Sequence, residues 1–423
     1  MNFFRRLFRS LNTIVAALIC VIIGLAIGFL ILTFLSWRVL ASGTEAYTIK
    51  DVIVQAWDLG FIRILEGGAY PIFNYARASY RQMRSELALM APLLMCGLSV
   101  GFAFKTGLFN IGAAGQYTLG AFGALLCGLV FKWPWYLCLL AAAVFGAVWG
   151  AIPGFFKAFF NINEVITAIM FNWIGLYGVN TLMYDTLKTT STVDGKTTVT
   201  YLMYNIKTTK TFTLKSVNAD AIIPQLGSES FLSSHKGSVI AEYLKSPVTY
   251  AVVIAIVIAV LLLIVLNKTT FGYELKACGY SRTAAKYAGI NEKRNIILSM
   301  AISGALAGLG AGLYYLTDTL QWNPQESTAL PGIGFDGISV ALLASSHPIG
   351  TIFSALLMAH ISTGGSLFDA SLFPPEVANI ISGVIIYLCA FMMLFKNLLL
   401  KPFGIARRRR ERRIANGKGG SRA

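Results

Sequence analysis

Long apolar stretches alternate with shorter polar ones from residue 12 to residue 396. Several apolar stretches reach about 20 residues, the length that an α-helix needs to cross the hydrocarbon core of a bilayer. We assign ten spans, the third and eighth of which are interrupted by glycines. Their approximate bounds are 12–35, 87–104, 109–130, 134–152, 164–184, 248–267, 296–316, 333–345, 349–364 and 376–396. The pattern predicts an all-α polytopic membrane protein.

The polar segments between the spans predict smaller elements. Residues 41–86 are amphipathic and are expected to lie along the membrane surface. Within residues 185–247, the stretches 196–204 and 210–215 alternate polar and apolar positions, which predicts a small β-rich insertion carrying a hairpin. We therefore expect one transmembrane domain over residues 1–396, followed by a basic tail, 397–423.

Composition supports a membrane protein. Of the 423 residues, 56% are hydrophobic and 13% are charged, whereas soluble domains have roughly a quarter charged residues. The formal charge of +16 has two interpretations, a nucleic-acid partner or an excess of basic residues on the cytoplasmic side of the membrane. We favour the second and expect membrane lipid, not nucleic acid, as the partner, because the basic residues flank the spans.

The basic residues also predict the topology. They gather before the first span, in the loop 268–295 and in the tail 397–423. With an even number of spans these three segments lie on the same side, which the positive-inside rule makes the cytoplasm. Both termini are then cytoplasmic, the loops 41–86 and 185–247 are extracellular, and the chain is a multi-pass protein of the plasma membrane. The first span has no small-residue cleavage site after it and is expected to be retained.

Two pairs of segments suggest an internal repeat. Residues 110–116 resemble 332–338, and residues 163–170 resemble 375–382. The paired spans run in opposite directions, so the repeat is inverted, a pattern that is common in transporters and places the binding site at the repeat interface. A chance match is the alternative.

Small-residue ladders mark helices that pack closely, because backbone approach replaces the hydrophobic effect as the attraction between helices in lipid. The ladders are Gly146 and Gly150 on the fourth span, and Gly304, Gly308 and Gly312 on the seventh. A pore-lining role is the alternative to packing.

The glycine-broken spans are the candidate translocation path, since broken helices are tolerated only beside protein or water. The polar residues near them are Asn110, Gln116, Asn172, Asn180 and Asp336. For Asp336 a helix N-cap is an equal alternative. Glu164 and Glu376 begin spans, where a carboxylate favours the helix dipole, so we interpret both as helix caps in preference to substrate contacts.

We find no catalytic triad, no paired catalytic carboxylates, no metal-ligand spacing and no phosphate-binding loop. The chain is therefore not expected to be an enzyme or to hold a metal or cofactor. Uphill transport would need a partner that binds ATP or an ion gradient. A gradient-driven carrier would bury several acids, and these spans have few.

A short helix is predicted inside the loop 268–295. Ser281 is a suitable N-cap and Gly289 a suitable stop. Small side chains leave one face able to enter a groove, and basic side chains can pair with acids around it. The predicted docking residues are Ser281, Arg282, Ala284, Ala285, Lys286, Tyr287, Ala288 and Gly289. An ordinary solvated loop is the alternative.

Motifs in the correct order over 90–184 and 248–396 resemble one known family. They are Gly107–Gly112, Asn163–Thr167, Thr270–Gly279, Ala284–Ile290, Met300–Gly308 and Gly334–Leu343. They resemble permease subunits of bacterial ATP-binding-cassette (ABC) importers for nucleosides and simple sugars, which are related to branched-chain amino acid permeases. The chain departs from the family at Ala114, where an acid is usual, and in its longer 187–218 insertion.

The resemblance implies a ten-span permease that transports nucleosides, or alternatively ribose-like sugars. It implies three protein partners: a second permease in a heterodimer, a dual-domain ATPase that binds ATP and docks at 281–289, and an extracellular substrate-binding lipoprotein. Two other hypotheses remain at this point, a stand-alone ion-coupled carrier and a membrane-embedded enzyme. The second would need a nucleophile or metal cluster that the sequence lacks.

Overall fold

A computed structural model of the chain describes residues 2–42, 47–67, 79–193, 196–205, 208, 210–226, 246–323, 329–369, 372–374 and 376–390. The chain forms two compact units, one from residues 1–63 with 365–423 and the other from residues 64–364. The predicted tail 397–423, and parts of the loops 41–86 and 185–247, lie outside the described residues.

Helices make up most of both units. Over the described residues, seven helices are long and apolar enough to cross a membrane. They lie within α1 (Asn2–Ser42), α5 (Ser79–Lys105), α6 with the π-turn after it (Ala113–Val130), α7 (Trp135–Phe160), α8 with its π-turn (Glu164–Thr186), α12 (Pro247–Lys268) and α15 (Glu292–Tyr315). The last three predicted spans correspond to α16 (Gly332–Leu343), α17 (Pro348–Gly365) and α18 (Glu376–Ala390).

The core of the larger unit is a backbone-to-backbone contact between α7 and α15. A Cβ added at Gly150 would lie 2.9 Å from the Gly304 Cα, and one added at Gly308 would lie 3.1 Å from the Gly146 Cα. The glycine ladders of the two helices thus interlock, and Gly312 continues the contact toward Leu139. Close approach of this kind is how helices attract one another in lipid.

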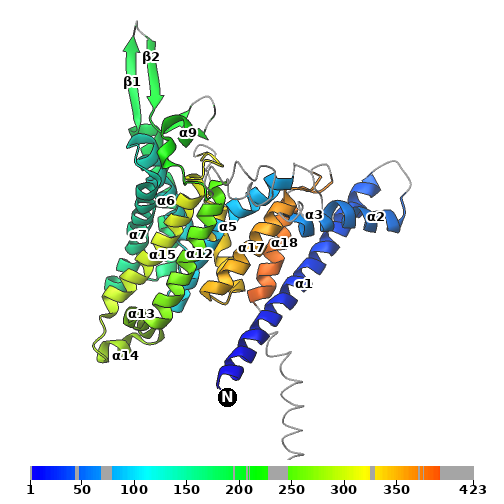
Figure 1. Ribbon diagram of the computed structural model, residues 1–423, viewed down its shortest axis with the longest axis horizontal. Coiled ribbons are helices and arrows are strands. Elements are labelled where there is room, and N and C mark those ends of the chain that lie inside the picture. The colour runs from blue at the N-terminus through cyan, green and yellow to red at the C-terminus, as the bar shows by residue number, and fades with distance from the viewer. Residues whose placement is uncertain are drawn as a thin grey trace, which may run out of the picture. The chain divides into compact units, whose positions relative to one another are not determined.

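The insertion after α8 contains two small antiparallel sheets. Strand β1 (Lys188–Val193) pairs with β2 (Lys196–Tyr201), and β3 (Tyr204–Asn205) pairs with β4 (Lys210–Thr211). The sequence did not predict β1, which is the partner of 196–201, whereas Tyr204 and Asn205 pair with the start of the stretch 210–215. In Figure 1 the β1–β2 hairpin and α14 (Arg282–Tyr287) lie at opposite ends of the helices of this unit.

The rest of the insertion folds onto the loop that follows α15. Thr211 N–H donates to the Trp322 carbonyl at 2.8 Å, and Leu214 N–H donates to the Asp318 carboxylate at 3.0 Å. Leu214 is almost fully buried. Residues 210–223 therefore cover this end of the bundle.

In the smaller unit, α1 packs against α18 and against a short helical segment, α2 (Ile49–Gln55) with its π-helical continuation η1 (Ala56–Phe61). Thr48 and Asp51 cap α2 reciprocally. Hydrogen bonds from Thr48 lower the pKa of the Asp51 carboxyl. Ile49 and Trp57 are exposed on this segment, and its predicted position on the membrane surface stays a prediction.

Candidate functional site

The short helix predicted in the basic loop is present as α14. The Ser281 hydroxyl caps its N-terminus by accepting a hydrogen bond from Ala284 N–H at 3.3 Å. Gly289 follows its C-terminus with φ = 77°, a left-handed conformation that costs glycine little. Both bounds agree with the sequence because caps depend on residues within one turn.

The orientation of α14 differs from the prediction. Ala285 is only 3% exposed and packs toward the protein's own helices, so it does not belong to an outward docking face. The outward side chains include Tyr287, which is 92% exposed, and Tyr280, just before the helix, which is 91% exposed. Ala284, Lys286 and Ala288 are also exposed. Aromatic side chains are enriched in protein interfaces, so this face is suited to a protein partner.

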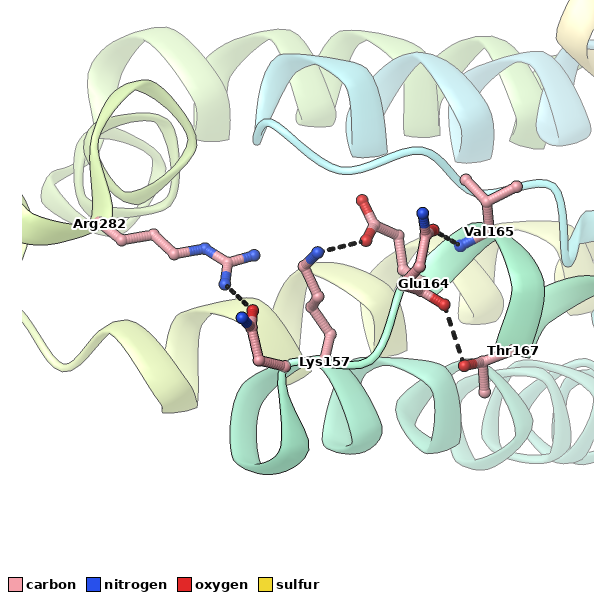
Figure 2. A network of polar contacts seen from close by, with 7 residues as sticks. Lys157, Glu164, Val165, Thr167 and Arg282 are labelled. Atoms are coloured by element: carbon pink, nitrogen blue, oxygen red, sulfur yellow. Dashed lines mark hydrogen bonds and ion pairs between the residues drawn. The ribbon is translucent and has the colours of Figure 1, made fainter.

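Polar contacts hold α14 against the turn between α7 and α8 (Figure 2). The Arg282 guanidinium donates to the Asn161 amide oxygen at 3.4 Å. Beside it, Lys157 and Glu164 form an ion pair at 2.7 Å. The N-cap of α8 is Asn163, whose side chain accepts from the backbone of the second helical residue. Glu164 is therefore the first helical residue and an ion-pair partner, and the predicted cap lies one residue earlier.

The segment after α14 is also fixed to the bundle. The Lys293 ammonium lies 4.7 Å from the centre of the Phe159 ring, a cation–π distance. Asn295 is buried and donates to the Glu274 carboxylate at 3.4 Å. The helix before α14, α13 (Thr270–Tyr280), is thereby tied to α15.

A buried polar network surrounds Asn110, in the turn before α6. Its side-chain amide donates to the Gln116 carbonyl oxygen and to the Ser303 hydroxyl, both at 2.7 Å. Its own carbonyl oxygen accepts from Gly112 N–H at 3.0 Å. Ser99 completes the network, and all four polar side chains are fully or almost fully buried. The network satisfies the broken start of α6, as buried polar groups require.

Asn172, on α8, also forms hydrogen bonds with the backbone at the start of α6. Its carbonyl oxygen accepts from Gly115 N–H at 2.8 Å, and its amide donates to the Ile111 carbonyl at 3.0 Å. Asn180, two turns further along α8, is partly buried, and among the described residues its carbonyl oxygen has no partner. The structure thus brings together three of the five predicted path residues, and uses their polar groups internally.

The start of α16 lies directly against the start of α6. A Cβ added at Gly334 would lie 2.6 Å from the Ala114 nitrogen, and Ala114 is fully buried. Ala114, the position where the sequence departs from the family that it resembles, is therefore packed directly against the backbone of α16. The two glycine-broken helices meet at this contact, although 220 positions separate the two residues in the sequence.

The outer face of α16 is open. Gly332 has no atom within 4 Å of an added Cβ, and the N-cap position Pro331 offers no capping side chain. Phe335 is 38% exposed and Asp336 is also exposed. Asp336 lies in the second turn of α16 and not at its cap position, so the alternative role as an N-cap does not apply. Glu376 is the first residue of α18.

One partly buried pair was not predicted from the sequence. His360, on α17, lies with Nδ1 3.2 Å from the Glu86 carboxylate and Nε2 3.0 Å from the Leu65 carbonyl. It therefore holds three segments together. Among the described residues, no group of three His, Cys, Asp or Glu side chains is arranged to hold a metal.

Burial, together with the nearby Lys105 ammonium, lowers the pKa of His347 in the turn before α17.

The apolar helices define a multi-pass membrane protein. Comparison with known proteins gives the family. Residues 83–390 match the family described as branched-chain amino acid transport system / permease component, and the chain belongs to it. Its members are transporters, so the chain is not an enzyme.

Curated relatives match most of the chain. It is 34% identical over 364 residues to the nucleoside ABC transporter permease protein NupB of Lactococcus lactis, covering 84% of this chain and 93% of the relative. It is 32% identical to the guanosine ABC transporter permease protein NupP of Bacillus subtilis, covering 90% and 94%. The glucose ABC transporter permease protein TsgB13 of Haloferax volcanii is 26% identical, covering 84% and 89%. No solved structure matches the chain.

Proposed function

We propose that the chain is a permease subunit of an ABC importer that moves nucleosides across the plasma membrane. The observation that carries this proposal is the similarity to two named nucleoside and guanosine permeases, at 34% and 32% identity over nearly their whole lengths. Transfer of a substrate class at this identity is reasonable because the aligned region includes both broken helices and α14.

We further propose ten membrane spans with an inverted repeat, both termini in the cytoplasm and the β-rich insertion outside. The seven span-length helices with α16, α17 and α18 support this count. The basic character of the 268–295 segment supports a cytoplasmic position for α14, and the β1–β2 hairpin lies at the other end of the same unit.

In this proposal, transport is driven by a dual-domain ATPase that binds ATP and contacts α14. The contact residues are the exposed side chains Tyr280, Lys286 and Tyr287, with Ala284 and Ala288 between them, and not Ala285. A substrate-binding lipoprotein delivers the nucleoside on the outer face.

A second, non-identical permease completes the translocation path. Asp336 supports this step, since a carboxylate at membrane depth must face protein or water and cannot face lipid. In this structure it is exposed on α16, so we place the second permease and the substrate cavity on that face. Asn110, Gln116 and Asn172 then form the polar layer behind it.

The test is uptake by a reconstituted complex of both permeases, the ATPase and the lipoprotein in proteoliposomes. We expect ATP-dependent uptake of labelled guanosine and uridine, with ribose and glucose transported poorly. Uptake by this chain alone under an ion gradient would instead support the ion-coupled carrier.

Simple sugars are the second candidate cargo, because one relative is named a glucose permease. Preferential binding of ribose or glucose to the lipoprotein, with no nucleoside binding, would favour this candidate over the first.

The docking surface is tested by Tyr287→Ala. Loss of an exposed aromatic anchor at an interface costs about 2 kcal/mol, so we expect ATPase binding to weaken by more than about tenfold. Tyr136→Ala is the matched control, because Tyr136 is 57% exposed at the other end of α7. Equal ATPase binding by both variants would remove Tyr287 from the docking surface.

A further inference from the structure

We propose that Gly279 and Gly107 are positioning residues that pass the movement of α14 to the broken starts of α6 and α16. The inference rests on the proposed function, because it assumes that an ATPase moves α14. It extends that function by naming the route from the docking helix to the face that bears Asp336.

The first step is the joint between α13 and α14. One residue, Ser281, separates the two helices. Its N–H donates to the Ala277 carbonyl at 3.1 Å, and its carbonyl accepts from Ala285 N–H at 3.0 Å. Ser281 is hydrogen-bonded to both helices, and no other residue separates them. A displacement of α14 therefore also moves α13.

The second step is a contact between backbones. Gly279, in the last turn of α13, packs on the turn that follows α5. An added Cβ would lie 2.7 Å from Gly107 N and 2.5 Å from the Thr106 carbonyl carbon. Gly107 has φ = 75°, which favours glycine. Because no side chain separates the two backbones, no rotamer change can absorb a displacement of α13.

The third step runs along a short, firmly held segment. Only Leu108 and Phe109 separate Gly107 from Asn110. Leu108 is buried with Ile296 and Met300 of α15, and Phe109 stacks on Phe104 with ring centroids 4.8 Å apart. Tight packing transmits displacement instead of dissipating it.

The last step is the Asn110 network itself. Asn110 binds Gly112 and Gln116, which flank the first turn of α6. Ala114, between them, abuts Gly334 of α16, again without an intervening side chain on the α16 side. A shift of the turn at Gly107 therefore reaches both broken helices through contacts of backbone and short polar side chains.

A second connection from α14 is weaker. The Arg282–Asn161 hydrogen bond is 3.4 Å long and exposed, and a long flexible side chain can stretch without moving α7. The backbone contact at Gly279 is the better mechanical link.

The experiment compares Gly279→Ala with Gly178→Ala in the full complex. Gly178 is an exposed helical glycine with no atom within 4 Å of an added Cβ, so its variant controls for the methyl group. We expect Gly279→Ala to keep assembly and basal ATP hydrolysis. Stimulation of hydrolysis by loaded lipoprotein should fall by about fivefold or more, the lower end of usual coupling between sites. Equal stimulation in both variants and the wild type overturns the inference.

Spin labels give a second measurement that does not depend on the variant folding. In a chain with the native cysteines replaced, one pair at positions 283 and 148 reports α14, and a pair at 335 and 148 reports α16. All three side chains are exposed, and none is a proposed contact of the ATPase. We expect both distances to change together on ATP binding. A change in the 335–148 distance without one in the 283–148 distance overturns the inference, whereas absence of any stimulation or uptake in the wild type contradicts the proposed function instead.

Discussion

The starts of α6 and α16 resemble each other in sequence but not in their surroundings. At α6, the side chains of Asn110 and Asn172 bind the broken backbone, Ser99 of α5 and Ser303 of α15 bind Asn110, and all four are buried. At α16, the side facing Ala114 is tightly packed, while Gly332 and Asp336 on the other side are open. The difference is that the start of α6 is supported entirely within this chain, whereas α16 keeps one open face.

Breaking the support should have the largest effect on stability. Asn110→Leu keeps the side-chain volume but removes the hydrogen-bond partner of the Gln116 side chain and of Gly112 N–H, and each such buried group costs about 1–3 kcal/mol. We expect the free energy of unfolding of the purified chain in detergent to fall by at least about 2 kcal/mol. The unfolding temperature should be lower as a result. Asn180→Leu is the control, because the Asn180 carbonyl oxygen has no partner among the described residues. Equal losses in both variants would contradict the support role.

Removing the cap that α8 provides should have a smaller effect. Asn172→Ala deletes the acceptor for Gly115 N–H, and loss of a helix cap costs about 1 kcal/mol. Thermal unfolding should place this variant between Asn110→Leu and the wild type. If it unfolds with the wild type, water has replaced the cap and α6 is less rigid than the comparison requires.

On the other side of the comparison, Asp336→Asn should leave stability within about 0.5 kcal/mol of the wild type, as for other exposed substitutions. Transport should still fall, on the order of tenfold, if the carboxylate forms a charged hydrogen bond in the assembled path. The measurement is uptake beside thermal unfolding of the same preparation. A stable, fully active variant would show that this face does not line the path.

Features fixed by a few neighbouring residues could be predicted from the sequence. The bounds of α14 follow from Ser281 and Gly289, which act within one turn. The apolar stretches also predicted the positions of the helices, because the thickness of the bilayer sets the length of a transmembrane helix.

Features that depend on residues distant in the sequence could not be predicted from it. The amide of Asn110 binds Ser303, 193 positions away, and nothing near Asn110 in the sequence indicates that its hydrogen bonds are used internally. The inward orientation of Ala285 depends likewise on the helices beneath it. The pairing of β1 with β2 was missed because the Thr-rich residues 188–193 lack the apolar alternation that marks a half-buried strand.

The glycine contact between α7 and α15 has a consequence for mutational tolerance. Most residues on the surface of a membrane helix can be exchanged, because lipid adapts to their shape. At Gly146, Gly150, Gly304 and Gly308, any replacement adds at least one carbon where the opposite backbone already lies. A saturation scan scored by amount of folded protein should therefore show four positions that accept nothing, a regularly spaced signature that depends on neither the cargo nor the partners.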